Sequence, residues 1–232
     1  MNRFRTPGRP RGQRQIALTL VVASLCLSAC ETPMPTPIQG AELTFDGLQP
    51  VAGTGMQRAW VRPDVSVAGY DRILPVAPRV EYRTVRHGSS RGAGAVALDD
   101  KQKARLLELI RAEFIDELGK SQYFRLTDEP GPEVLQLETA LLDIVSYVGE
   151  APAGRSREWV ASLGEATLVL QLRDSQSGET LVRTADRRAF EDASGGSRNT
   201  PVSNTAQVRR VARRWARILR DRLDQMHEHS LK

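Results

Sequence analysis

The chain has 232 residues, with 33 Lys or Arg against 28 Asp or Glu, and a formal net charge of +5. Five arginines with no acidic neighbour precede Cys30 and account for the whole excess, so the chain after them is formally neutral. This balance argues against bulk electrostatic attraction to nucleic acid, and we expect no nucleic-acid partner. The length after Cys30 is sufficient for one domain with a full hydrophobic core.

An uncharged apolar run extends from Ile16 to Ala29 and ends in Leu27-Ser28-Ala29-Cys30. A basic start, an apolar stretch and small residues at a cut before cysteine are typical of a bacterial lipoprotein signal. The run is shorter than the roughly 18 residues that a membrane-spanning helix needs. We therefore expect residues 1–29 to be a cleaved signal peptide and Cys30 to carry the lipid that anchors the protein to a membrane. An ordinary secretory signal with another cleavage point is the alternative.

Residues 30–42 form a predicted tether, because three closely spaced prolines favour an extended polyproline-like chain. Glu31 follows the cysteine at a position where related lipoproteins of two-membrane bacteria use aspartate to stay in the inner membrane. The absence of aspartate predicts an outer-membrane location, with the domain facing the periplasm. Residues 43–232 are the predicted single periplasmic domain.

Three segments after the tether resemble a known family. They are Gly47-Leu48, the Pro63-Asp64 pair ahead of Tyr70-Asp71, and the run Ile73-Leu74-Pro75-Val76-Ala77-Pro78. These features are similar to the bacterial lipoproteins grouped as domain of unknown function 3313, over about Leu43 to Leu223. The resemblance implies a lipoprotein signal and no assigned activity, so it supplies no catalytic residue.

The first half of the domain contains a predicted strand and a predicted helix. Tyr70–Val85 is the strand, and Pro75 and Pro78 place it at an edge or a bulge. The helix begins at Asp99 as N-cap, with Gln102 completing a capping box, and ends at Gly119. Its predicted apolar face consists of Leu106, Leu107, Leu109, Ile110, Phe114 and Leu118.

The second half alternates apolar and polar residues in several stretches, which predicts strands at Tyr123–Leu126, Glu133–Val148, Glu165–Asp174 and Thr180–Phe190. A turn at residues 174–178 makes the last two strands an antiparallel hairpin. A second helix is expected from the N-cap Asn204 to about Met226. The order of elements predicts an α+β fold: an antiparallel β-sheet with two helices packed on one face.

The second predicted helix divides into an apolar arc centred on Trp215 and an arginine arc. The candidate partner-binding residues on the arginine arc are Arg209, Arg210, Arg213, Arg214, Arg217 and Arg220. This face suits an envelope protein or anionic lipid such as lipid A phosphates, or the acidic half of another copy. A solvated surface is the alternative. We expect reversal of Arg210, Arg213 and Arg217 to leave stability nearly unchanged.

Catalytic and metal-binding motifs are weak. Ser90 lies in a G-x-S-x-G match, but the predicted helix starts too late for a nucleophile elbow. The histidines downstream, His227 and His229, fall in a predicted polar tail. Cys30 is the one cysteine after the signal, so we expect neither a metal nor a cofactor.

We therefore expect a non-enzymatic outer-membrane lipoprotein that serves in envelope interaction or assembly. A hydrolase acting on envelope glycan or lipid and an auxiliary subunit of an envelope transporter are the alternatives. Trp60, Arg62, Arg157 and Trp159 are of residue types common at interface hot spots, although packing in the core or at its rim explains them as well.

Overall fold

The computed structural model describes residues 34–81, 98–148, 161–190 and 201–230. All of them belong to one compact unit, Pro33–Lys232. The predictions on the signal peptide, Cys30, Ser90, Arg157 and Trp159 lie outside the described residues.

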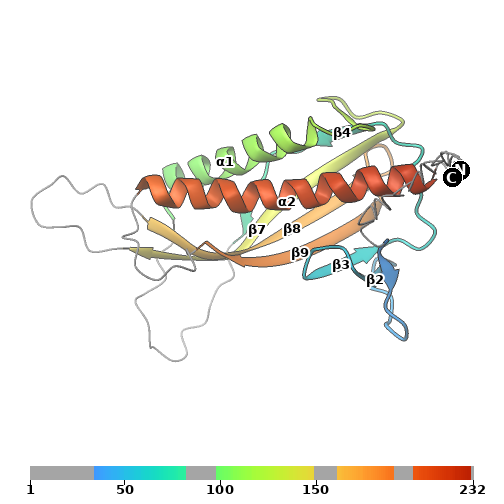
Figure 1. The fold of residues 1–232 in the computed structure, drawn as a ribbon, viewed down its shortest axis with the longest axis horizontal. Helices are drawn as coiled ribbons and strands as arrows, with labels where there is room; N and C mark the ends of the chain where they lie inside the picture. Colours follow the sequence, from blue (N-terminus) through green and yellow to red (C-terminus); the bar gives the residue numbers. More distant parts are fainter. Residues whose placement is uncertain (1–33, 82–97, 149–160, 191–200, 231–232) are drawn as a thin grey trace, which may run out of the picture. The chain divides into compact units, whose positions relative to one another are not determined.

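The unit is a nine-stranded sheet with two helices on one face (Figure 1). The strand order is β1-β2-β3-β9-β8-β7-β4-β6, and β5 also pairs with β7. The strands are β1 (Thr36–Pro37), β2 (Gln49–Ala52), β3 (Arg58–Val61), β4 (Arg72–Pro75), β5 (Arg79–Glu81), β6 (Arg125–Leu126), β7 (Val134–Val148), β8 (Ala161–Asp174) and β9 (Thr180–Ala189). The helices are α1 (Asp100–Leu118) and α2 (Pro201–Ser230). The predicted α+β class, with both helices on one face of a mostly antiparallel sheet, is confirmed.

The three long strands β7, β8 and β9 form the centre of the sheet. Their side chains alternate between two faces, and buried Leu168, Leu170 and Leu172 of β8 belong to the core beneath the helices. The opposite face is polar and carries ion pairs such as Arg187–Glu165 (2.5 Å) and Arg173–Glu138 (3.3 Å). The sheet therefore has one face in the core and one polar face.

Helix α1 begins as the sequence predicts. The Gln102 backbone N–H donates to the Asp99 carboxylate (2.8 Å), and the Asp99 N–H donates to the Gln102 side chain (3.0 Å). This reciprocal capping box satisfies two of the N–H groups at the helix start, and Gly119 caps the other end.

Helix α2 is longer than predicted at both ends. It starts at Pro201 rather than after Asn204, in agreement with the preference of proline for the first turn of a helix. It runs to Ser230, so His227 lies in the helix and not in a polar tail. Contacts with the segment after α1 hold this end of the helix: Ser121 donates to Asp224 (2.5 Å), and the His227 ring, past Met226, stacks on Tyr123 at 4.7 Å.

The N-terminal third departs most from prediction. The expected strand Tyr70–Val85 is described as far as Glu81, and that part contains two short strands, β4 and β5, because prolines interrupt it. Both strands run parallel to β7, so the sheet is mixed. Part of the predicted tether is β1, which pairs with β2. Strands β2 and β3 were not predicted, since four residues are too few for a clear alternation.

Candidate functional site

Helices α1 and α2 lie side by side and run in the same direction (Figure 1). Two glutamates of α1, one turn apart, face α2 and are buried, with Glu113 7% and Glu117 3% exposed. Neither was part of the predicted apolar face, although Glu113 directly precedes Phe114 and Glu117 directly precedes Leu118, two members of that face. A carboxylate buried to this degree requires charged or hydrogen-bonded partners, and α2 supplies them.

Arginines of α2 bind both glutamates. The Arg213 guanidinium donates to Glu113 (2.9 Å), and Arg209 lies 3.8 Å from the other oxygen of the same carboxylate. Arg220 donates to Glu117 (2.7 Å), which also accepts from Lys120 (3.0 Å). The Arg217 Nε atom lies 4.0 Å from Glu117. These contacts form an arginine–glutamate ladder between the helices.

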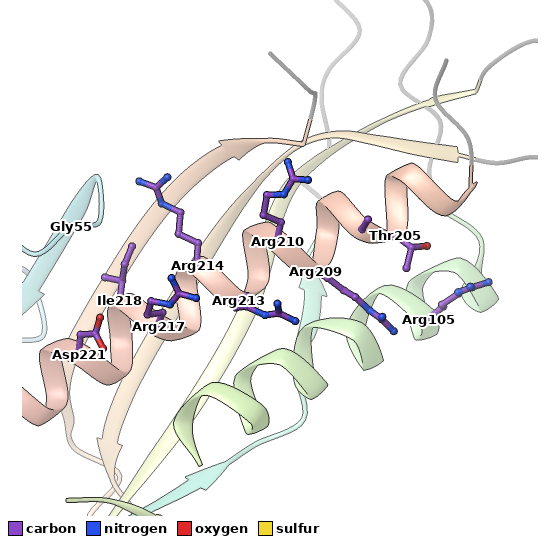
Figure 2. A pocket seen from close by; sticks show the side chains of 11 residues that line it. Gly55, Arg105, Thr205, Arg209, Arg210, Arg213, Arg214, Arg217, Ile218 and Asp221 are labelled. Atoms are coloured by element: carbon purple, nitrogen blue, oxygen red, sulfur yellow. The ribbon is translucent and has the colours of Figure 1, made fainter. Parts of the chain in front are cut away.

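The ladder divides the predicted arginine arc into two rows, which Figure 2 shows. Arg209 and Arg213 extend toward α1, whereas Arg210 and Arg214 extend away from it. Arg220 is 18% exposed and also bonds Asp221, so it belongs to the helix packing and not to the open face. Five of the six arginines on the predicted arc are exposed, whereas Arg220 is not, because Glu117 of α1 and Asp221 lie beside it.

An open groove of about 1080 Å³ follows the arginine side of α2. Six arginines and one acidic residue are among its lining side chains. The lining residues are Gly55, Arg105, Thr205, Ala206, Arg209, Arg210, Arg213, Arg214, Arg217, Ile218 and Asp221. We call this surface the arginine groove, and its lining suits an anionic ligand.

The turn between β2 and β3 forms one wall of the arginine groove. Gly55 has a φ of +82°, a conformation that favours glycine, and a Cβ atom there would lie in tight contact, 3.3 Å, with the Ile218 side chain. Arg222 donates to the carbonyl of Thr54 (3.1 Å) and to that of Gly53. These two hydrogen bonds from Arg222 fix the turn against α2.

Neighbouring charges and hydrogen bonds near the arginine groove shift the pKa values of Asp116 and Arg220 toward their ionised forms. The hydrogen bond from Lys120 holds the pKa of Asp116 below its ordinary value, and Arg213 lowers it further. Burial acts to lower the pKa of Arg220, but the hydrogen bond to Asp221 and the nearby carboxylates raise it overall. The Asp116 carboxylate therefore remains charged at neutral pH.

Beneath the groove, Trp215 is the predicted central anchor of α2 and is 0% exposed. Its ring packs edge-on against Phe190, and its indole N–H donates to Asp186 of β9 (2.8 Å). Asp186 is 1% exposed and also accepts from Arg188 (2.6 Å) and from the Gln57 backbone N–H (3.0 Å). This sealed cluster positions the arginine side of α2 toward solvent.

Other sequence candidates have structural contacts. Arg62 donates to the carbonyls of Thr180 (3.0 Å) and Asp46 (3.1 Å), and so ties a loop to β9. Trp60 is half-buried on β3. Within the described ranges, no group of three or more His, Cys, Asp or Glu residues could hold a metal ion, and no helix is long and apolar enough to cross a membrane.

Sequence reasoning missed Glu113 and Glu117. A usable signal was present: the two acids are four residues apart on α1, and Arg209, Arg213 and Arg217 repeat at the same interval on α2. Side chains at this interval share one face of a helix, so two parallel helices can match them pair by pair.

The solved structures that are similar to this chain include the following three. A Xanthomonas campestris protein of the DUF330 family has 12% identity and a TM-score of 0.44, covering 74% of this chain and 94% of that one. A protein described as a neuraminyllactose-binding hemagglutinin homolog from Helicobacter pylori has 10% identity and a TM-score of 0.38, with 72% and 94% covered. A minor lipoprotein from Acinetobacter baumannii has 8% identity and a TM-score of 0.31, with 66% and 94% covered.

No curated protein matches the sequence significantly. The sequence profile described as "Protein of unknown function (DUF3313)" matches residues 39–219, which include most strands, all of α1 and the arginines of the groove. The match agrees with the resemblance carried by Gly47-Leu48 and by the segment around Tyr70. The chain therefore belongs to the DUF3313 family.

Proposed function

We propose that this protein is a lipid-anchored, non-enzymatic binding module of the bacterial cell envelope, and that it holds an anionic partner in the arginine groove. The observation that carries the proposal is the lining itself, in which six arginines face one acidic residue. Guanidinium groups bind carboxylate and phosphate oxygens through paired hydrogen bonds, so such a lining selects anions.

The glutamates of the arginine–glutamate ladder do not neutralise its positive charge, so the ladder supports the binding of an anion. Glu113 has two arginines within 4 Å, and Glu117 has two arginines and a lysine. Cations thus outnumber acids along the ladder, while the buried glutamates restrict the side-chain freedom of the arginines. Side chains that are already ordered lose less entropy when a ligand binds.

The anchor rests on the sequence. The apolar run before Cys30 supports lipidation there, and Glu31 supports an outer-membrane location. Mass spectrometry of the mature N-terminal peptide should show acyl mass on Cys30, and Cys30→Ala should leave an unprocessed precursor. Glu31→Asp should shift the protein to inner-membrane fractions in a density gradient. A mature protein without acyl mass would contradict the anchor, and equal fractionation of both forms would contradict the location.

The groove is tested on the lipidated protein in detergent, with inorganic polyphosphate and a polyglutamate peptide as probes at low salt. The double variant Arg210→Glu/Arg214→Glu reverses two exposed residues of the row that extends away from α1. The matched control, Arg58→Glu/Arg125→Glu, changes the total charge equally but alters residues outside the groove lining.

We expect wild type and control to bind the probes, and the groove variant to bind at least about tenfold more weakly. Binding should also weaken with salt, since exposed charges are screened over about 10 Å at 0.1 M. Equal affinity in all three proteins would overturn the assignment of the groove. Turnover of envelope lipid or glycan that Ser90→Ala abolishes would contradict a non-enzymatic role.

A further inference from the structure

The chain enters the fold at one end of α2. Strand β1 pairs with β2, and the Ile38 N–H donates to the Pro50 carbonyl (3.0 Å). Met34 and Pro35 line a recess together with Met226, near the C-terminal end of α2. The fold therefore extends into the predicted tether, at least as far as Met34.

Little chain remains between this point and the proposed anchor. Residues 31–33 separate Cys30 from Met34, so the two are at most about 14 Å apart even when the chain is fully extended. Along α2, Arg209 lies 17 residues before Met226, or about 26 Å at the helical rise. A domain anchored at Cys30 can therefore lay α2 along the membrane that holds it.

The groove lining argues for one kind of partner. Ala206 and Ile218 are the lining residues with purely apolar side chains, beside six arginines. Stable protein interfaces usually place a cluster of aromatic or aliphatic anchors at their centre, whereas this groove is lined by no aromatic residue and by one large aliphatic residue, Ile218. Headgroup phosphates need no such anchor, and a bilayer presents many of them along the length of a helix.

We propose that the arginine groove docks on the anionic phospholipid headgroups of the membrane that carries the Cys30 anchor. This inference rests on the proposed function and names the partner of the same groove. The apolar face of α2 is packed in the core around Trp215, so contact is electrostatic and peripheral, without insertion of the helix. Each arginine near an anionic surface strengthens adsorption about fivefold.

The anchor makes this docking intramolecular. A short connection keeps the groove at a high effective concentration of lipid, so weak individual contacts are enough to bias the orientation of the domain. On a neutral bilayer the same protein stays attached through its lipid, but no electrostatic attraction turns the arginine groove toward the bilayer surface. Orientation, not attachment, is therefore the quantity to measure.

The orientation can be measured with a fluorophore on a single introduced cysteine. The chain after the signal has no cysteine besides Cys30, which carries the lipid in this proposal, so the label modifies one position. Ala206→Cys places a donor fluorophore in the arginine groove, and Ala189→Cys places one at an exposed position of β9 that faces away from the helices by strand alternation. The full lipidated proteins are inserted into phosphatidylcholine vesicles with or without phosphatidylglycerol, and energy transfer to acceptor-labelled lipid reports the distance to the bilayer.

We expect transfer from position 206 to rise at least about twofold when phosphatidylglycerol is present, and transfer from position 189 to fall or stay level. Salt should return both to their neutral-bilayer values, and Arg210→Glu/Arg214→Glu should remove the rise while Arg58→Glu/Arg125→Glu keeps it. Equal transfer from position 206 on both bilayers overturns this inference. If polyglutamate still binds the groove in that case, the proposed function survives with an acidic protein as partner.

Discussion

Asp186 and Glu113 are both buried acids bonded to arginine, but they lie in different surroundings. Asp186 lies in the core, where an indole N–H, a backbone N–H and the Arg188 guanidinium satisfy it. Glu113 lies at the edge of the helix layer, where Arg213 and Arg209 approach it and are themselves 48% and 56% exposed.

The difference shows that contacts between a buried carboxylate and arginine can serve stability at one place and anion binding at another. At Asp186, mostly neutral donors close the site, and the bonds tie together β9, α2 and the segment before β3. At Glu113, the charges of two arginines, Arg213 and Arg209, lie beside one carboxylate charge, and both arginines line the groove. We expect disruption of the Asp186 cluster to affect mainly stability and disruption of the ladder to affect mainly anion binding.

The largest expected effect is that of Trp215→Ala. The side chain is fully buried against Phe190 and supplies one donor to Asp186, so its removal should cost about 3–5 kcal/mol of unfolding free energy. Denaturant titration measures this value. Trp215→Phe keeps an aromatic ring but lacks the indole N–H and should lose less. A loss below roughly 1 kcal/mol for alanine would show that α2 is oriented differently.

Asp186→Ala should follow, at about 3 kcal/mol, because it leaves Arg188 and the Trp215 indole without their shared acceptor. Asp186→Asn retains an acceptor and should lose less. Polyphosphate binding, measured at a temperature where both variants are folded, should not change. A large change in binding with no change in stability would reverse the roles that we assign to the two regions.

Variants of two neighbouring residues, one from each row of the arginine arc, distinguish the roles of the two rows. Arg213→Glu places a second negative charge beside Glu113 and should destabilise by about 1–2 kcal/mol, a value kept small by the partial exposure of this pair. Arg214→Glu, on the other row, should change stability by under about 0.5 kcal/mol. The expectation that reversal of Arg210, Arg213 and Arg217 together is neutral is therefore revised. Equal melting temperatures for the two single variants would contradict the ladder.

Glu113→Gln has a small expected effect on stability, and this variant tests the charge of the ladder alone. Glu113→Gln removes the carboxylate charge but keeps a hydrogen-bond acceptor for Arg213, so stability should fall by only about 1 kcal/mol. Affinity for polyphosphate should rise about fivefold, because positive charge at the groove is no longer offset. Exposed Glu108 on the same helix provides the control, and Glu108→Gln should change neither quantity. Weaker binding by Glu113→Gln would show that the glutamate serves mainly to position the arginines.

Long periodic elements could be predicted from the sequence. Helix α1 starts at the capping box of Asp99 and Gln102, and the hairpin β8–β9 follows from alternation and a polar turn, because these signals act between residues that are close along the chain. Short strands such as β2 and β3 have no comparable local signal. They form because β3 pairs with β9, more than a hundred residues away.

The arginine groove shows the same division. The amphipathic pattern of α2 determined by itself that Trp215 faces the core and that arginines occupy the opposite arc, since both follow from the period of one helix. Only the tertiary structure decided which arginines bind the buried glutamates of α1, because α1 is the neighbour of that arc and contacts one of its rows, whereas Arg210 and Arg214 extend away from it. The faces of a helix follow from the spacing of its own residues, which is a local property of the chain. Which helix lies beside it depends on how both helices pack on the sheet, and this involves residues far apart in the sequence.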